Sequence, residues 1–115
     1  IYLKENFTPE TVRENFKAFL SLIAPQYYRQ VEKKLMNTAN ELIKYQISQV
    51  FFPKEALVKG DTATVTGIKK IYAGEHLAEQ KPVKISIRFK INQGKFEVLK
   101  YEEMAYNTNR SSNNG

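Results

Sequence analysis

The sequence predicts an α+β fold in which two helices come first and a four-stranded antiparallel meander follows. Apolar residues recur at helical spacing through the first part of the chain, and they alternate with polar residues in its last part. The clearest alternation is Val83–Ile91, where β-branched and aromatic residues occupy every second position. Helices in a run followed by strands in a run favour helices packed on one face of a single sheet.

The first helix is expected to begin at Thr8-Pro9-Glu10, with Thr8 as its N-cap and Pro9 in its first turn. Because a residue that precedes proline avoids helical geometry, Ala24-Pro25 should end this helix. Residues 1–7 are interpreted as a short, poorly packed lead-in. The apolar stripe of this helix comprises Val12, Phe16, Phe19, Leu20 and Ile23.

A long second helix is predicted from about Pro25 to Tyr45, since no glycine or further proline interrupts this stretch. Proline can occupy the first turn of a helix, so Pro25 both ends the first helix and opens the second. The stripe of the second helix comprises Tyr28, Val31, Leu35, Ala39, Leu42 and Ile43.

Four strands are expected after these helices, beginning with Ser48–Val58, which should be broken or bent at Pro53. The second strand is Thr62–Ala73, and Gly67 within it suggests a bulge or bend. Residues 74–82 are polar and are interpreted as a loop that carries His76. Strands Val83–Ile91 and 96–101 follow.

A turn at Asn92–Lys95 would join the last two strands. It would pair Ile91 with Phe96, Phe89 with Val98, and Lys90 with Glu97, an opposite-charge cross-strand pair. The apolar phase shifts after Val98, so a second bulge is expected there. Residues 1–106 are therefore predicted to form one domain, and the Asn- and Ser-rich residues 107–115 a disordered polar tail.

No catalytic, cofactor or metal site emerges from the residues. Cysteine is absent, His76 has only Glu75 and Glu79 near it in sequence, and Glu102 and Glu103 should point to opposite faces of a strand. The interior positions expected from the two periodicities are all apolar and offer no acid or base. They are Phe16, Phe19, Leu35, Leu42, Ile85, Ile87, Phe89 and Val98.

The net charge of +6 is spread along the chain and does not gather into a run. Direct nucleic-acid binding is therefore not expected, because such proteins concentrate their basic groups on one face. The basic residues of the strands are interpreted as a solvated outer face of the sheet. They are Lys69, Lys70, Lys84, Arg88, Lys90, Lys95 and Lys100.

Aromatic residues supply the candidate contacts with partner proteins. In each of the doublets Tyr27-Tyr28 and Phe51-Phe52, one ring can enter the core while the other points elsewhere. Exposed aromatic rings are enriched at interfaces. The candidate contacts are Tyr27, Tyr28, Phe51, Phe52 and Tyr72.

Three short stretches, with the order of the elements, resemble the TraE family of F-type conjugative transfer systems: Ile23-Ala24-Pro25, Val50-Phe51-Phe52 and the second strand from Val65 to Gly74. The resemblance spans about Pro9 to Glu103. It implies a nuclear-transport-factor-2-like fold, similar to the periplasmic domain of the eighth VirB component of type IV secretion systems. The family's asparagine-proline-x-glycine turn is missing, which affects any interface built on that turn.

The resemblance further implies a non-enzymatic assembly factor without a cofactor. Its partners would be other secretion-system subunits, with self-association possible. The chain would be a periplasmic domain whose single inner-membrane helix precedes Ile1. Two other functions stay open on the residues. One is a small isomerase- or hydratase-type enzyme, which would need an acid or base in the helix–sheet cleft. The other is a basic nucleic-acid-binding domain, which would show steeply salt-dependent affinity.

Overall fold

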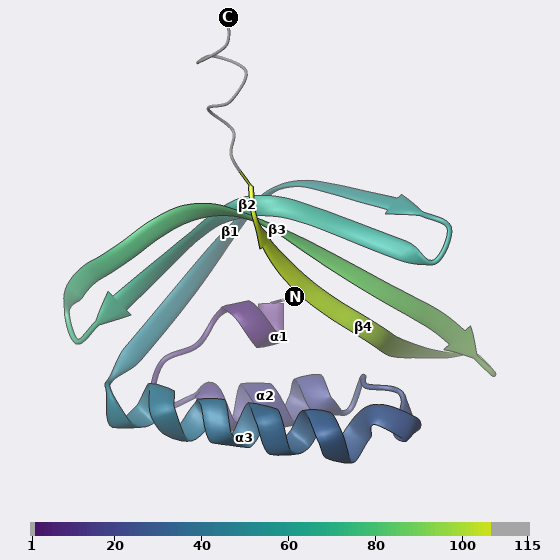
Figure 1. The fold of residues 1–115 in the computed structure, drawn as a ribbon, viewed down its shortest axis with the longest axis horizontal. Coiled ribbons are helices and arrows are strands. Elements are labelled where there is room, and N and C mark those ends of the chain that lie inside the picture. Colours follow the sequence, from purple (N-terminus) through teal and green to yellow (C-terminus); the bar gives the residue numbers. More distant parts are fainter. Residues whose placement is uncertain (1, 107–115) are drawn as a thin grey trace, which may run out of the picture.

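The computed structural model describes residues 2–106, in which the helices lie along one face of a curved four-stranded antiparallel sheet (Figure 1). The strand order is that of a meander, so the predicted α+β class is confirmed. The expected tail, 107–115, lies outside the described residues. The elements are α1 (Tyr2–Glu5), α2 (Val12–Leu20), a 3₁₀ turn (Pro25–Tyr27), α3 (Tyr28–Lys44), β1 (Ile47–Lys59), β2 (Thr62–Ala73), β3 (His76–Asn92) and β4 (Lys95–Ala105).

Helix α2 is shorter than expected at both ends. Residues Thr8–Thr11 form a turn, in which the backbone N–H of Val12 donates to the carbonyl of Thr8 over 3.0 Å, and the helix follows it. At the other end Ile23 leaves the helix and bridges to Val98 of β4. The prediction of one helix from Thr8 to Ala24 was therefore too long, because backbone pairing with the sheet edge competes for the last turn. The second helix agrees with the prediction, and Pro25 opens it.

Residues 2–7 are not part of a poorly packed lead-in, which is what the sequence suggested for residues 1–7. Helix α1 lies between the sheet and the layer of α2 and α3 (Figure 1). Phe7 is buried in the core and exchanges both backbone hydrogen bonds with Gln49 of β1, at 3.0 and 2.9 Å. The segment is too short to show a helical period, which is why the sequence pattern missed it.

The register of β3 and β4 confirms the predicted turn. Ile91 pairs with Phe96, Phe89 with Val98, and Lys90 with Glu97, whose charged groups lie 3.7 Å apart. The expected second bulge is present, because Leu99 has no partner between Val98 and Lys100.

The bend of β1 at Pro53 is also present, but the bulge predicted within β2 at Gly67 is wrong. The extra residue is Lys54 of β1, and β2 runs regularly through Gly67. Gly67 instead permits close approach of β1: a Cβ at this position would lie 2.8 Å from the Phe51 ring and 2.9 Å from the Cα of Pro53. Glycine is thus required here by packing.

The polar loop expected at residues 74–82 is strand from His76 onward, and only Gly74 and Glu75 form a turn. Lys69 pairs with Lys81 and Ile71 with Glu79, and one further extra residue, Ala78, bends the strand before Tyr72 pairs with Leu77. This arm of the sheet is largely exposed. Its backbone ladder needs no apolar face, and for that reason residues 76–82 show no apolar alternation.

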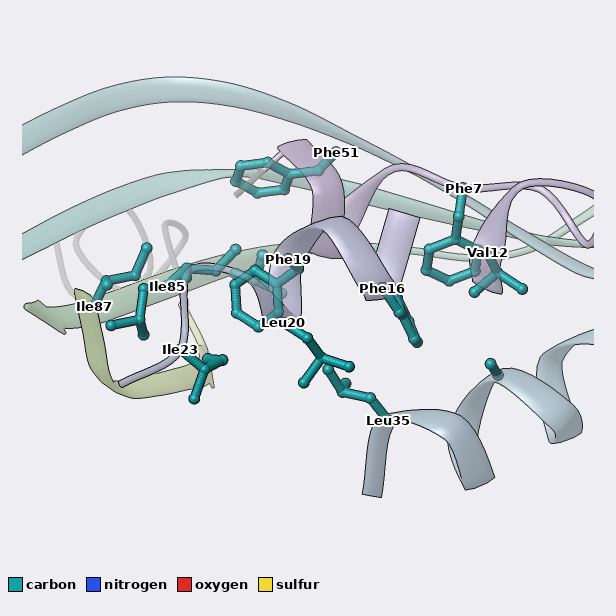
Figure 2. Close-up of a cluster of buried hydrophobic side chains, with 13 residues drawn as sticks. Phe7, Val12, Phe16, Phe19, Leu20, Ile23, Leu35, Phe51, Ile85 and Ile87 are labelled. Carbon is teal, nitrogen blue, oxygen red and sulfur yellow. The ribbon is translucent and has the colours of Figure 1, made fainter. Parts of the chain in front are cut away.

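The core is the apolar cluster between the helices and the concave face of the sheet (Figure 2). Of the interior positions expected from the sequence, six are buried, while Leu42 and Phe89 are half-buried. Phe89 stacks on Phe96 with ring centroids 5.1 Å apart at the end of the β3–β4 hairpin. The buried apolar residues are Phe7, Val12, Phe16, Phe19, Leu20, Ile23, Leu35, Ala39, Phe51, Val83, Ile85, Ile87 and Val98.

Gly67→Ala should lower the free energy of unfolding by about 1–3 kcal/mol, the usual cost of forcing extra volume into a packed site. Urea titration followed by circular dichroism measures it. Gly60→Ala is the control, since Gly60 has open space around it and a φ of +62°, so only backbone strain is introduced. An equal or smaller loss at Gly67 than at Gly60 would contradict the packing argument.

Candidate functional site

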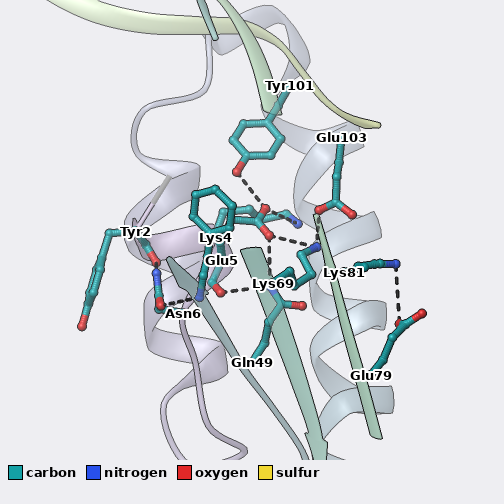
Figure 3. Close-up of polar contacts among 11 residues, drawn as sticks. Tyr2, Lys4, Glu5, Asn6, Gln49, Lys69, Glu79, Lys81, Tyr101 and Glu103 are labelled. Atoms are coloured by element: carbon teal, nitrogen blue, oxygen red, sulfur yellow. Dashed lines mark hydrogen bonds and ion pairs between the residues drawn. The ribbon is translucent and has the colours of Figure 1, made fainter. Parts of the chain in front are cut away.

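A group of polar and ionised side chains is enclosed between α1 and the concave face of the sheet (Figure 3). We call it the Glu5 cluster; it comprises Glu5, Gln49, Lys69, Tyr101 and Glu103. Glu5 is 1% exposed and Lys69 is 6% exposed. Charged residues are seldom so buried unless they are paired, so the contacts of this cluster decide what it can do.

Strand geometry places the members of the cluster. Lys69 shares the concave face of β2 with Val65, because β2 runs regularly between them. On β4 the extra residue Leu99 changes the alternation, so Tyr101 and Glu103 face inward while Lys100 and Glu102 face outward.

Each oxygen of the Glu5 carboxylate has a donor. Oε1 lies 3.1 Å from Nζ of Lys69 and accepts a 2.9 Å hydrogen bond from Nε2 of Gln49. Oε2 accepts a 2.8 Å hydrogen bond from the Tyr101 hydroxyl, and Nζ of Lys4 lies 3.8 Å away. The Gln49 amide also donates to the backbone carbonyl of Glu5. The carboxylate is therefore fully coordinated.

Lys69 is shared between two acids. Its ammonium group contacts Glu5 and also pairs with the carboxylate of Glu103, whose side chain is partly exposed. A buried ammonium ion has three donors that need acceptors, and the carboxylates of Glu5 and Glu103 supply two of these acceptors here. The ion pairs of Lys69 thus join α1, β2 and β4, and Gln49 adds β1 through its hydrogen bond to Glu5.

The pKa values agree with this arrangement. Burial alone would raise the pKa of Glu5, but the positive charges of Lys4 and Lys69, with hydrogen bonds from Tyr101 and Lys69, together hold it below the usual value of 4.5. Burial, and next the charge of Glu5, raise the pKa of Tyr101 well above its ordinary value. Glu5 is therefore ionised and Tyr101 neutral near pH 7.

The expectation that no ionisable group lies in the interior is wrong. It assigned Lys69 to the outer face together with its neighbour Lys70, and it left Glu5 in a poorly packed lead-in. The alternation of Val65, Gly67, Lys69 and Ile71 was the signal that could have placed Lys69 inside. Nothing in the sequence indicated that Glu5 lies beside it.

A hollow of about 370 Å³ lies next to the cluster, between α2, α3 and β4. Its apolar lining comes from Phe19, Ile23, Val31, Leu35 and Val98. Polar groups at its margin include Lys4, Tyr27, Gln30, Lys34 and Lys100. A pocket with apolar walls and a few polar groups is the general form of a ligand site.

The chemistry available beside this hollow is limited. Both oxygens of Glu5 are occupied by donors and its pKa is lowered, so it is a poor general base at neutral pH. The Tyr101 hydroxyl already donates to Glu5, and its raised pKa makes it a poor acid. The geometry suits a structural tie better than proton transfer.

The other acidic residues considered in the sequence are separated. Glu79 pairs with Lys81, while His76 is exposed at the start of β3. Glu102 pairs with Lys100 on the outer face and Glu103 with Lys69 on the inner face, so these two do point in opposite directions. No group of three or more potential metal-ligating side chains occurs within residues 2–106.

The candidate partner contacts divide between two surfaces. Tyr27 and Tyr28 are both exposed where α3 begins, so neither ring enters the core. Phe52 is 48% exposed on the outer face of the sheet, and Tyr72 lies half-buried on the same face. Phe51 is only 4% exposed and belongs to the core, so it is removed from the candidate contacts.

The outer face of the sheet is less basic than its sequence suggested. Lys69 is buried, contrary to its assignment to this face. Arg88 pairs with Asp61 at 3.3 Å and Lys100 with Glu102 at 3.0 Å. Lys70 lies over the ring of Phe52, 5.3 Å from its centroid.

Three solved structures share this arrangement of helices and sheet. Agrobacterium tumefaciens VirB8 superposes with a TM-score of 0.69 at 9% identity, covering 92% of this chain and 85% of that one. An IcmL-like type IV secretion system protein of Legionella pneumophila gives 0.58 at 12% identity, covering 91% and 84%. CagV of Helicobacter pylori, described as a VirB8 homolog, gives 0.55 at 9% identity, covering 93% and 92%. The fold is that of the VirB8-like proteins.

The sequence itself matches the family model described as TraE protein over residues 1–103. The chain belongs to the TraE family, as the resemblance noted in the sequence predicted. No protein with curated annotation matches it in sequence.

Replacing Glu5 by glutamine should lower the free energy of unfolding by about 2–3 kcal/mol at pH 7, because a charge-assisted contact to buried Lys69 is lost. The folded pKa of Glu5 is depressed, so its contribution is present above the unfolded value of 4.5 and is lost as pH falls through the folded pKa. The difference from wild type should therefore shrink below about pH 4.5.

Urea titrations of both proteins at a series of pH values measure this difference. Glu14→Gln is the control, because Glu14 is an acid in the first turn of α2 outside the cluster. A Glu5→Gln effect that stays constant from pH 7 to pH 3 would show that its charge does not stabilise the fold.

Proposed function

We propose that this chain is the periplasmic, non-catalytic domain of an inner-membrane component of a type IV secretion system, acting as an assembly scaffold in conjugative DNA transfer. The observation that carries the proposal is the TraE family match, which spans residues 1–103. The shared fold supports it, since the similar structures include an IcmL-like type IV secretion system protein and a VirB8 homolog of such a system.

The Glu5 cluster supports a scaffold over an enzyme. A catalytic carboxylate is usually poised near neutral pKa with one oxygen free to reach a substrate. Glu5 has a lowered pKa and donors on both oxygens, and its main contacts tie α1 to three strands. We infer that the cluster stabilises the surface presented to partners.

An enzyme with the same fold is the second candidate. The observation that favours it is the hollow of about 370 Å³ beside two buried ionised groups. Tyr101 is the member of the cluster that both lines this hollow and carries an exchangeable proton. Its substitution therefore separates the two functions.

Location at the inner membrane is part of the proposal. Among residues 2–106 no helix is long and apolar enough to cross a membrane. In the proposed arrangement a membrane helix precedes Ile1 and leaves this domain in the periplasm. Direct nucleic-acid binding is not proposed, since the outer basic groups are divided among ion pairs and an aromatic contact.

Other secretion subunits and further copies of the chain are the proposed partners. Tyr27 and Tyr28 would meet one partner at the start of α3, while Phe52 and Tyr72 would meet another across the sheet. Two separate aromatic surfaces suit a scaffold, because it must hold more than one neighbour at once.

In cells whose transfer system lacks this gene, the full-length protein should restore conjugation, and Tyr101→Phe should restore it to a similar frequency. The variant loses one hydrogen bond to Glu5 but keeps the packing of the ring on Phe19. Removal of a catalytic proton donor would lower the rate about 10²- to 10⁴-fold. Mating frequency measures the outcome, with immunoblotting to confirm equal protein levels; a loss of that size at equal levels would favour the enzyme.

A photo-crosslinking amino acid placed at Tyr28 and, separately, at Phe52 should capture different partners in cells. The two side chains lie on α3 and on the outer face of the sheet, so a single partner cannot easily cover both. Crosslinked bands identified by mass spectrometry give the result. Placement at buried Phe51 is the control and should give no intermolecular band. An absence of bands from both exposed sites would contradict the proposed surfaces.

A further inference from the structure

The second half of β1 is an open sheet edge. β1 is the first strand of the sheet, and its first half is covered by Asn6 and Phe7, which bond to Phe51 and Gln49. Beyond Pro53, no hydrogen bond within residues 2–106 reaches the outer side of Lys54–Lys59. This hairpin arm projects away from the helices (Figure 1).

Two large apolar side chains are exposed on the open edge, between the charged residues Glu55 and Lys59. Leu57 is 66% exposed and Val58 is 65% exposed, and they lie on opposite faces because they are neighbours in a strand. A row of unpaired backbone groups flanked by exposed apolar side chains is a template for pairing with another strand. The partner that covers this edge should therefore be another chain segment in extended conformation.

The register of β1 shows which backbone groups point outward. Gln49 bonds outward to Phe7, and the direction alternates along a strand. The extra residue Lys54 shifts this alternation, so Glu55, Leu57 and Lys59 bond toward their partners in β2. Ala56 and Val58 are left with outward N–H and C=O groups.

We propose that the edge pairs with the same edge of a second copy, antiparallel and with the two-fold axis at Leu57. Ala56 of each copy would then lie opposite Val58 of the other, and these pairs would exchange the outward backbone hydrogen bonds. Leu57 would meet Leu57 in the non-hydrogen-bonded position. Glu55 of each copy would lie opposite Lys59 of the other on the same face.

Charge complementarity selects this register. The backbone N–H and C=O groups that point away from β2 in one copy must face the same kind of groups in the other copy. The two-fold axis can therefore fall at Ala56, Leu57 or Val58. An axis at Ala56 places Glu55 opposite a leucine, and an axis at Val58 places Lys59 opposite a leucine. The axis at Leu57 alone forms two Glu–Lys pairs, and opposite charges placed directly across a sheet attract.

This pairing names the surface through which the self-association proposed above would occur, so it rests on the proposed function. Only the residues of one short edge meet, so the interface falls in the small, transient class. Association should therefore be weak in dilute solution and should increase with local concentration.

Cysteine crosslinking tests the register, because the chain has no cysteine of its own. Facing residues in a non-hydrogen-bonded antiparallel pair have Cα atoms about 4.5 Å apart, within the range that a disulfide spans. Leu57→Cys in the 115-residue chain should form a disulfide-linked dimer under mild oxidation. A mixture of Glu55→Cys and Lys59→Cys chains should crosslink with each other.

Each of the two mixed variants alone is the matched control. Two copies of Glu55→Cys, or of Lys59→Cys, would hold their thiols four residues apart along the strands, about 13 Å, which no disulfide spans. Lys95→Cys, in the exposed β3–β4 turn, measures random collision. Non-reducing electrophoresis should show the Leu57→Cys dimer at least about tenfold above the Lys95→Cys level, whereas equal levels would overturn the pairing.

Exchange of the two charges tests the register independently. Glu55→Lys in the Leu57→Cys chain places lysine opposite lysine twice and should reduce the dimer, and adding Lys59→Glu should restore it. Failure of the rescue would overturn the register. Wild-type sedimentation separates the two proposals: self-association without Leu57 crosslinking would reject this edge alone, while a strict monomer at high concentration without crosslinking would reject self-association itself.

Discussion

The buried pairing of Glu5 with Lys69 is the constraint on which the concave side of the molecule depends. An ammonium ion buried against the concave face of the sheet would be strongly destabilising without acceptors, and Glu5 reaches it only because α1 folds back between the sheet and α2. Gln49 and Tyr101 then complete the coordination of the carboxylate. Each contact comes from a different element, so the position of α1 is fixed by polar contacts as much as by apolar packing.

Single extra residues shape the sheet around this centre. Lys54, Ala78 and Leu99 each interrupt the ladder once, and such bulges increase local bend and twist. The bulge at Leu99 also turns Tyr101 inward. The same extra residue therefore bends the sheet and places Tyr101 in the Glu5 cluster. The hairpin arms extend past the helices, which leaves the end of β1 without cover. The strands are longer than the helices that cover them. The covered part of the sheet forms the core, and the uncovered part leaves the edge of β1 open.

The apolar periodicity predicted most of the fold. Repeats of apolar residues occur in α3, in β1 and β2, and in the strands on either side of the β3–β4 turn, and many of these residues pack in the core. Periodicity failed where stability comes from polar contacts. The start of β3 is held by backbone bonds in an exposed arm, and α1 has a single turn, so neither shows a repeat. Lys69 was misplaced because a buried lysine contradicts the general rule, and only the distant Glu5 makes it acceptable. Of the candidate contacts, Phe51 and Phe52 illustrate the remaining difficulty: alternation separates the two rings but does not say which is inside.

The hydrogen bond between Tyr101 and Glu5 joins residues from opposite ends of the described chain. A pulling force applied ahead of Tyr2 would pass through one helical turn directly into β2 and β4, with little slack to absorb it. Contacts loaded in parallel resist such tension together, whereas a frayed terminus would peel away residue by residue. Displacing α1 from the sheet would therefore require the contacts of Glu5 with Gln49, Lys69 and Tyr101 to break together.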